Sequence, residues 1–321
     1  MNFGNAKIAV LLPCYNEAQT VEKVVRDFLR VLPTATVYVY DNNSTDGTGD
    51  IARAIGDSRV VVKREPRQGK GNVVRSMFRE IDADCYLMAD GDDTYPAEAA
   101  PELVAAILRD GYDMAIGDRL SSTYFTENKR PFHNLGNRLV RGMVNFIFRG
   151  KVRDIMTGYR AFSYDFVKCT PILSDGFEVE TEMTVSALDR KFKLVEIPVA
   201  YRDRPEGSVS KLHTLRDGFR VLRSIMHMFR DYRPLAFYGL ISLLFAGVGV
   251  GLFIPILLEF LATGLVPRIP TLIVSSILCL GAMLSFVTGS ILEVIIKKNR
   301  QQVQVEMNAI SAARRAYKEK L

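Results

Sequence analysis

The first half of the chain alternates short apolar runs with longer stretches in which apolar residues recur every three or four positions. The short runs are typical of buried strands, and the longer stretches are typical of amphipathic helices. The predicted strands cover Ile8–Leu12, Thr36–Tyr40, Val60–Val62 and Cys85–Ala89, and the predicted helices cover Ala18–Val31, Asp46–Ile55 and Asn72–Ile81. This alternation predicts an α/β domain with a doubly wound, mostly parallel sheet and with ligands at the carboxyl ends of its strands.

Two long uncharged segments follow in the last third of the chain, Leu235–Leu258 and Ile269–Leu292. Each has about 24 residues, or roughly 36 Å as a helix, which is enough to cross a hydrocarbon core of about 30 Å. The net charge is +4 over Lys211–Arg233 and +5 over Lys297–Leu321, against +6 for the whole chain. Because basic flanks favour the cytoplasmic side, the pattern predicts a transmembrane hairpin whose short turn, Glu259–Arg268, lies outside.

These patterns divide the chain into four parts. We expect a cytosolic α/β domain over 1–211, an amphipathic juxtamembrane helix over 212–233, a membrane hairpin over 234–296 and a basic cytosolic helix over 297–321. In the second part an apolar stripe runs beside a basic one, which is typical of a helix in the headgroup region, although a helix packed under the domain is an alternative. The N-terminus lacks the pattern of a signal peptide, so we expect the N-terminal domain to stay in the cytosol. With the two apolar segments, the chain is expected to be a multi-pass protein of the cytoplasmic membrane.

The positive charge belongs to the membrane edges, because the rest of the chain has a net charge of −3. No nucleic-acid partner is therefore expected. The four cysteines are scattered along the chain, with no pair at the spacing of metal ligands. They are expected to be reduced thiols that are mostly buried.

A polar motif follows each of the first four predicted strands. The motifs are Pro13-Cys14-Tyr15-Asn16-Glu17, Asp41–Thr48, Arg67–Gly71 and Asp90-Gly91-Asp92-Asp93-Thr94. Because parallel strands end at one edge of a sheet, we expect the motifs to line one crevice. Asp90 and Asp92 offer hard oxygen ligands that suit Mg²⁺ or Mn²⁺ bound together with a diphosphate. The alternative is a surface turn in which Asp93 or Thr94 caps a helix that starts near Pro96.

Two common nucleotide-binding signatures are absent from the sequence. Gly69-Lys70-Gly71 is not part of a P-loop, because Gly-x-x-x-x-Gly-Lys-Ser/Thr does not occur, and no Gly-x-Gly-x-x-Gly opens the fold. A dinucleotide cofactor is therefore not expected. Taken alone, Asp41–Thr48 is also consistent with an ordinary turn, since Asn, Ser, Asp and Gly are turn residues.

As a set, the four motifs closely resemble glycosyltransferase family 2, with its GT-A fold. The resemblance continues through Gly117-Asp118-Arg119, Asp154–Arg160, Phe177–Glu180, Tyr201–Arg204 and Gly207–Leu212. The order is similar to that of the polyprenyl-phosphate glycosyltransferases, the group that contains dolichol-phosphate mannose synthase and its bacterial undecaprenyl-phosphate relatives. It covers residues 6 to about 230, and the membrane hairpin fits the branch with several membrane spans.

The resemblance implies roles for individual residues. Those placed at the nucleotide sugar are Pro13, Tyr15, Glu17, Asp41, Lys70, Asp90 and Arg204. Those placed at the acceptor phosphate are Arg119, Arg202 and Lys211. The metal ligands are Asp90 and Asp92, and the catalytic candidates are Asp92, Asp154 and Arg119. For Arg202 and Arg204, the alternative is that they are charges on an edge strand. Glu178 and Glu180 either have a direct role at the site or are first-turn carboxylates at a helix N-terminus.

The resulting expectation is a metal-dependent, inverting transferase that moves one sugar from a nucleotide sugar to undecaprenyl or dolichyl phosphate. UDP-glucose and UDP-N-acetylhexosamine are the favoured donors. A lipid monophosphate has a second pKa of about 6 and is already an anion near pH 7, so it needs no general base. Asp154 is then expected to orient an arginine or the sugar.

We expect the protein to form a homo-oligomer. Two alternative functions remain. A polysaccharide synthase of the same fold carries a Gln-x-x-Arg-Trp motif, whereas this chain has no Trp. A non-catalytic nucleotide-sugar-binding subunit of an assembly complex would be favoured by loss of the metal ligands, yet Asp90 and Asp92 are both present.

Overall fold

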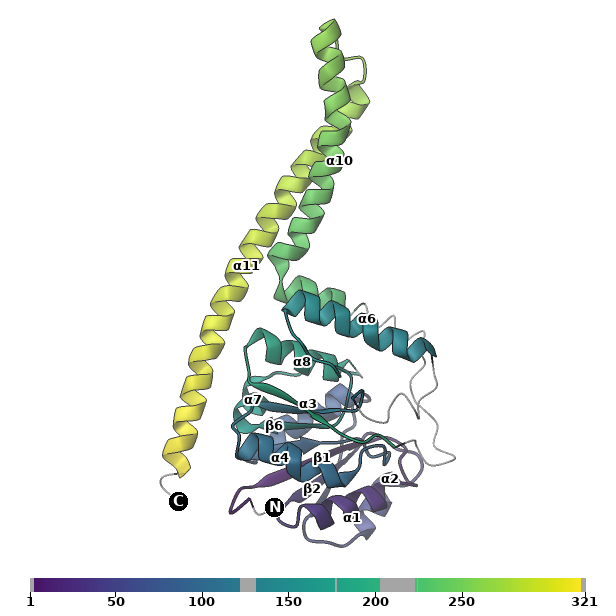
Figure 1. Ribbon diagram of the computed structural model, residues 1–321, viewed down its shortest axis with the longest axis vertical. Coiled ribbons are helices and arrows are strands. Elements are labelled where there is room, and N and C mark those ends of the chain that lie inside the picture. The colour runs from purple at the N-terminus through teal and green to yellow at the C-terminus, as the bar shows by residue number, and fades with distance from the viewer. Residues whose placement is uncertain (1–2, 122–130, 177, 203–222, 224, 319–321) are drawn as a thin grey trace. The chain divides into compact units, whose positions relative to one another are not determined.

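The computed structural model describes residues 3–121, 131–176, 178–202, 223 and 225–318 of the chain. The chain forms two compact units, Met1–Leu222 together with Met307–Leu321, and Arg223–Glu306. The first unit is an α/β domain, and the second is a helical hairpin (Figure 1).

A mixed seven-stranded sheet forms the centre of the first unit, with the strand order β3-β2-β1-β4-β6-β5-β7 (Figure 1). The strands are β1 (Ile8–Cys14), β2 (Thr36–Asp41), β3 (Val60–Arg64), β4 (Cys85–Met88), β5 (Met114–Asp118), β6 (Arg160–Ser163) and β7 (Leu194–Pro198). Among them β6 alone runs antiparallel to its neighbours, β4 and β5. The other six strands therefore end at the same edge, which we call the carboxyl edge. The four predicted strands and the mostly parallel sheet are confirmed.

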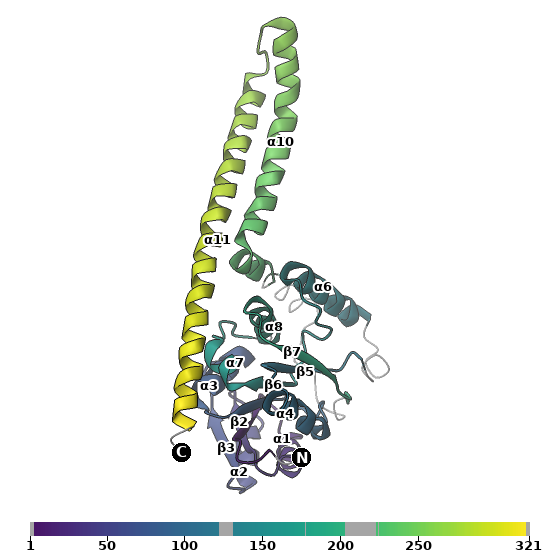
Figure 2. The same ribbon diagram turned by 60° about the vertical axis from the view of Figure 1, so that its left-hand side comes forward.

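Helices cover both faces of this sheet (Figure 2). They are α1 (Val21–Val31), α2 (Thr48–Ala54), α3 (Lys70–Glu80), the short 3₁₀ helix η1 (Ala97–Ala99), α4 (Ala100–Leu108), α7 (Tyr164–Cys169) and α8 (Val179–Asp189), and α6 (Pro131–Phe148) packs against α8. On one face Phe28 of α1 and Leu103 of α4 join the buried core formed with β1. On the other, the rings of Phe78 in α3 and Phe162 in β6 lie 5.6 Å apart. Burial of each such side chain contributes about 1.5–3 kcal/mol, so both layers stabilise the sheet.

Helix starts differ from the predicted ones by a few residues. The helix predicted from Ala18 begins at Val21. The Val21 amide donates to the Glu17 carbonyl at 2.9 Å, so a turn over residues 17–21 precedes the helix. The helix predicted from Asn72 begins two residues earlier, at Lys70. As a result, Glu17 lies in the loop between β1 and α1, and Lys70 is the first residue of α3, directly after the loop that follows β3.

The second unit contains both predicted apolar segments, within α10 (Pro234–Thr263) and α11 (Ile269–Lys318). Each helix is long and apolar enough to cross a membrane, and many of its large apolar side chains are exposed. The two helices approach closely at Gly249, whose carbonyl accepts a hydrogen bond from Ser275 Oγ at 2.9 Å. A Cβ at Gly249 would lie 2.9 Å from Cys279 Sγ. Small residues at such crossings are typical of helices that pack in lipid.

The predicted membrane helix and the predicted basic helix lie in one element of the structure. Instead of a membrane helix and a separate basic helix over 297–321, α11 is one continuous helix of 50 residues, and its end from Met307 onward belongs to the first unit. Most of the predicted juxtamembrane helix, 212–233, lies outside the described residues, although 225–232 are helical.

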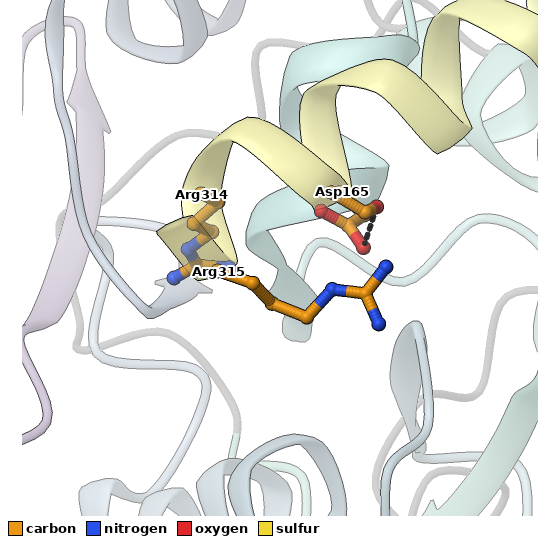
Figure 3. A pocket seen from close by; sticks show the side chains of 4 residues that line it. Asp165, Arg314 and Arg315 are labelled. Atoms are coloured by element: carbon orange, nitrogen blue, oxygen red, sulfur yellow. Dashed lines mark hydrogen bonds between the residues drawn. The ribbon is translucent and has the colours of Figure 1, made fainter. Parts of the chain in front are cut away.

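The end of α11 packs against the start of β4 and against α7. Arg314 donates to Asp84 Oδ1 at 2.5 Å, and its guanidinium lies 3.9 Å from the centroid of the Tyr164 ring. Ser311 Oγ donates to Asp165 Oδ2 at 2.8 Å, and these side chains line a hollow of about 390 Å³ (Figure 3). Because Asp84 directly precedes β4, this contact lies at the edge of the sheet opposite the carboxyl edge.

Candidate functional site at the carboxyl edge of the sheet

The carboxyl ends of β1, β2, β3, β4 and β5 lie at one edge of the sheet, and the chain passes this edge once more just before β6. Most of the predicted site residues are carried by these ends and by the loops that follow them. They are Pro13, Tyr15, Glu17, Asp41, Lys70, Asp90, Asp92, Arg119 and Asp154. The antiparallel β6 is what brings Asp154 here, because a strand that runs backwards begins at the carboxyl edge.

The loops after β1 and β2 are tied together by side chains of the first two motifs. Asn16 has a left-handed backbone conformation, with a φ of 54°. Its backbone amide donates to Ser44 Oγ at 2.9 Å, and its side-chain Oδ1 accepts from the Thr45 amide at 2.8 Å. Asp41 Oδ1 accepts from the Ser44 amide at 3.1 Å. The turn interpretation of this motif is therefore correct for Ser44 and Thr45, while Tyr15 stays exposed on the loop.

The two aspartates after β4 have different surroundings. Asp92 is 2% exposed, and its Oδ1 accepts from Thr94 Oγ at 2.6 Å. Asp90 is more accessible, and its Oδ1 accepts from Lys70 Nζ at 2.5 Å. The surface-turn alternative for this motif is wrong, since Asp92 is buried and the helices that follow have no side-chain cap.

Glycines allow the backbone to approach these carboxylates closely. A Cβ at Gly91 would lie 2.7 Å from Cys14 Sγ, and one at Gly158 would lie 2.7 Å from Asp90 Oδ2. Real Cβ contacts are not this short, so a larger residue at either position would displace the loop after β1 or the Asp90 carboxylate. The ends of β1 and β4 and the segment before β6 are thus packed against one another around Asp90.

Lys70 joins Asp90 to a carboxylate that comes much later in the chain. Its Nζ lies 2.5 Å from Asp90 Oδ1 and 2.6 Å from Glu180 Oε1, near the start of α8. Burial by itself lowers the pKa of Lys70, but the charges of Asp90 and Glu180 and the hydrogen bonds to them outweigh it and raise this pKa above its ordinary value. The ammonium is therefore a fixed positive charge inside the site.

The glycines on either side of Lys70 serve close packing. Gly69 has a φ of 126°, and a Cβ there would lie 2.1 Å from the carbonyl oxygen of Asp175; a Cβ at Gly71 would lie 2.1 Å from that of Ser174. The Gly71 amide donates to the Asp175 carbonyl at 3.0 Å. Glycine is needed at both positions because the turn rests directly on the backbone of 171–176. This packing carries Lys70 to the segment that leads into α8.

A buried ion pair joins the end of β5 to the segment before β6. Arg119 Nε donates to Asp154 Oδ2 at 2.8 Å, and Arg119 and Asp154 are 8% and 1% exposed. The guanidinium also lies 5.8 Å from the centroid of the Tyr201 ring. The backbone amides of Arg153 and Asp154 donate to Glu196 Oε1, and burial raises the pKa of that carboxyl. Asp154 thus holds the Arg119 guanidinium in one orientation, while its role in the reaction stays a prediction.

Comparison with known proteins decides the family. The profile of glycosyl transferase family 2 matches residues 9–170, which is half of the chain and includes every motif from the end of β1 to β6. Glycosyltransferase AglJ of Haloferax volcanii is 32% identical over 298 residues, which cover 92% of this chain and 96% of AglJ. The chain belongs to glycosyl transferase family 2.

The relatives of this chain include proteins named for a lipid phosphate. Dolichyl-phosphate hexose transferase of Haloferax volcanii is 28% identical over 226 residues, covering 70% of this chain and 95% of that protein. Crystalline glucosyl-3-phosphoglycerate synthase of Mycobacterium tuberculosis, in complex with Mn²⁺, UDP and glucosyl-3-phosphoglycerate, has a TM-score of 0.56 at 20% identity, over 71% of this chain and 80% of that one. This likeness supports the GT-A-like fold predicted from the motifs.

Arg160 anchors the family 2 motif that ends in it. The side chain is fully buried, and its nitrogens donate to the carbonyls of Ile155 and Thr157 at 2.5 and 2.9 Å and to Thr184 Oγ1 at 2.8 Å. Burial lowers the pKa of Arg160 to about 10, so the guanidinium is still charged at neutral pH. From the other side, the Gly158 amide donates to the Tyr95 hydroxyl at 3.1 Å. Arg160 therefore holds the backbone between Asp154 and Gly158 in place.

The Asp90-x-Asp92 pattern of family 2 implies a divalent metal ion. Within the described part of the chain, no three His, Cys, Asp or Glu side chains are grouped so that they could hold a metal by themselves. The Asp90 carboxylate forms an ion pair with the Lys70 ammonium, so its position suits a positive charge. Two hard oxygen donors fit Mg²⁺ or Mn²⁺ when water and a diphosphate complete the coordination. The residues present therefore fit a metal shared with the donor and not a metal held by protein alone.

The remaining predicted phosphate binders are only partly described. Arg202 lies beyond the end of β7, so the edge-strand alternative does not apply to it. Its amide donates to the Thr94 carbonyl at 3.0 Å, and its half-exposed guanidinium lies 3.6 Å from Glu98 Oε2. Arg204 and Lys211 lie outside the described residues, and their roles remain predictions.

Sequence reasoning missed several residues that build the site. For Glu180 the sequence leaves open a direct role and that of a helix N-terminal carboxylate but names no partner, and it assigns no role to Glu196, Tyr95 or Arg160. Their spacing from their partners offers no local signal, because the Glu180 and Lys70 side chains meet across more than a hundred residues of chain. For Arg160 there was a signal, since a charged residue in an apolar strand implies buried hydrogen-bond partners.

Proposed function

We propose that this protein transfers one sugar from a nucleotide sugar to a polyprenyl phosphate at a membrane surface. The observation that carries the proposal is the combination, in one chain, of a family 2 site with a pair of long helices whose apolar side chains are exposed. A soluble acceptor gives no reason for such helices, whereas a lipid acceptor does. Kinship with dolichyl-phosphate hexose transferases supports the same acceptor class.

The donor side of the proposal rests on Asp90 and Asp92. A divalent ion bound there with the donor would offset the negative charge that grows on the departing diphosphate. The complex of the Mycobacterium tuberculosis fold neighbour with Mn²⁺ and UDP supports both the metal and a uridine donor. We therefore favour UDP-glucose or UDP-N-acetylhexosamine, with Pro13, Tyr15 and Asp41 near the nucleotide.

The acceptor side rests on the Arg119–Asp154 pair. Two anionic substrates must come together, and a guanidinium offers charge-assisted hydrogen bonds to phosphate. Asp154 holds this guanidinium in one orientation at 2.8 Å, so less ordering is needed when a phosphate arrives. The acceptor phosphate needs no deprotonation near pH 7, since its second pKa is about 6. Attack from the side opposite the diphosphate inverts the configuration at the sugar carbon.

A direct assay tests the proposal. The full-length protein in detergent would be incubated with UDP-glucose, UDP-N-acetylglucosamine or GDP-mannose and with undecaprenyl or dolichyl phosphate, and lipid products would be identified by mass spectrometry. We expect one sugar per lipid, no longer chains, and loss of product in EDTA that Mn²⁺ or Mg²⁺ reverses. A polymer would favour the synthase alternative. Binding of a nucleotide sugar without transfer to any lipid would favour the non-catalytic subunit.

Membrane topology gives a separate prediction. Thr263 is in the last turn of α10, close to the turn of the hairpin, and Asn299 follows the apolar part of α11. In a chain whose native cysteines are replaced by serine, Thr263→Cys should react in intact cells with a membrane-impermeant maleimide, and Asn299→Cys should react only after lysis, because basic flanks stay inside. The cysteine-free chain is the control. The reverse labelling pattern would show that the catalytic unit lies outside.

A further inference from the structure

The bridge from Lys70 to two carboxylates has a consequence for metal binding. One of its partners, Asp90, belongs to the proposed metal site, and the ammonium lies 2.5 Å from the oxygen Oδ1 that a metal could use. The other partner, Glu180, lies 2.6 Å away. A cation of the protein itself therefore occupies part of the position that suits a divalent cation.

The two carboxylates differ in exposure. The side chain of Asp90 is 28% exposed and that of Glu180 is 5% exposed, with 11% for Lys70 between them. Solvent and ligands thus reach Asp90 and not Glu180. A metal that arrives with a nucleotide can bind Asp90, and it leaves Glu180 as the nearest anionic partner for the ammonium.

The segment that carries Glu180 is firmly held. Before α8, the amides of Leu173 and Ser174 both donate to the carboxylate of Glu182 at 2.9 Å. Arg75 donates to the carbonyls of Ile172, Leu173 and Ser174 at 2.6, 2.9 and 3.1 Å. The Gly69–Gly71 turn packs directly on the same segment. Lys70 and Glu180 therefore belong to α3 and α8, which are both bonded to the segment 172–175, whereas Asp90 lies on the loop after β4.

We propose that Glu180 is a positioning residue that keeps the Lys70 ammonium in place when Asp90 binds a divalent cation. Lys70 then changes from the counter-ion of Asp90 to a contact of the donor diphosphate. This inference rests on the proposed function. In the free protein Lys70 offsets the charge of Asp90. With the donor bound, Lys70 stays on Glu180 and adds a second positive charge beside the departing group.

Mn²⁺ binding without nucleotide tests the first half of the inference. Lys70→Met removes the internal cation and leaves two carboxylates, so Mn²⁺ should bind about tenfold more tightly than to the wild type, since charges a few ångströms apart interact strongly even at an effective dielectric constant of about 20. Of the two carboxylates described around Lys70, Glu180→Gln leaves only that of Asp90, so it should weaken Mn²⁺ binding by about tenfold. Free Mn²⁺ is measured by electron paramagnetic resonance.

Two variants control for charge and for folding. Lys70→Arg keeps the positive charge and should keep Mn²⁺ affinity within about threefold of the wild type. Lys23→Met removes another ammonium bonded to the same loop, at 2.7 Å from Asp93 Oδ1, but this lysine is half-exposed. It should change Mn²⁺ affinity by less than about twofold, because exposed pairs are screened. Circular dichroism confirms that each variant is folded.

A double-mutant cycle tests whether Glu180 acts through Lys70. With Mn²⁺ present, Lys70→Met and Glu180→Gln should each weaken UDP binding by about tenfold. If Glu180 only positions the lysine, then Glu180→Gln should add almost nothing in the Lys70→Met background. Additive losses would overturn the inference and leave the proposed function standing, as would unchanged Mn²⁺ affinity in both single variants. A wild-type protein that binds Mn²⁺ neither alone nor with UDP would overturn the metal part of the proposed function, and the inference with it.

Discussion

Asp92→Asn should lower the rate of sugar transfer by about a thousandfold or more, because one ligand charge is lost where the departing diphosphate must be neutralised. The fold should survive this change. Asp92 is buried and accepts from Thr94 Oγ through Oδ1, and the amide oxygen of asparagine can accept the same hydrogen bond. The measurement is initial-rate transfer to lipid at saturating donor, with the midpoint of thermal unfolding recorded beside it.

The neighbouring Asp93 offers a matched control. Its carboxylate pairs with Lys23 at 2.7 Å, and its φ of 59° is one that asparagine tolerates well. Asp93→Asn removes the same charge one residue away and should keep transfer within about threefold of the wild type, as expected for an ion pair with an exposed partner. Wild-type rates for Asp92→Asn, or full activity in EDTA, would mean that the metal role is wrong.

Arg160→Met should strongly lower the free energy of unfolding of the first unit. It leaves the carbonyls of Ile155 and Thr157 and the hydroxyl of Thr184 without their donor in a fully buried place. A buried acceptor left without its donor costs about 1–3 kcal/mol, so the three together cost about 3–5 kcal/mol or more. That corresponds to a thermal midpoint lower by about 6–20 °C for a domain of this size.

Transfer activity should fall in the same variant even well below its melting temperature, because the backbone between Asp154 and Gly158 loses its anchor. Arg53→Met is the control, since Arg53 makes an exposed pair with Asp50 on α2. Its thermal midpoint and its activity should match those of the wild type. If Arg160→Met behaved like Arg53→Met, the buried guanidinium would not be what holds the segment.

The sequence predicts the parallel half of the fold and the residues at its strand ends, because both follow from local patterns. Asp90 and Lys70 each follow a predicted strand, so the rule that parallel strands share an edge is enough to bring them together. The antiparallel β6 could not be placed this way. Its four residues, Arg160–Ser163, are too short for periodicity to identify, and its partners are set by packing with β4 and β5.

Pairings between distant residues are the second part that sequence could not supply. The sequence suggests that Asp154 orients an arginine or the sugar, but it does not identify Arg119 as that arginine, and it does not place Glu180 beside Lys70. Charge alone does not determine which of many basic residues pairs with Glu180. Glu180 is 4% exposed, and a carboxylate that is buried to this degree needs a hydrogen-bond or ion-pair partner close by in the fold. The structure supplies that choice.

The contact between the end of α11 and Asp84 makes the sugar-transferring unit discontinuous in sequence. A fragment that stops at residue 222 would contain every strand but not Arg314, so the Tyr164 ring and the Asp84 carboxylate would lose the guanidinium that covers them. A detergent-free version of this unit is therefore better obtained by excision than by truncation. Residues 223–306 would be replaced with a flexible Gly/Ser linker, so that the last turns of α11 remain tethered to the domain they complete.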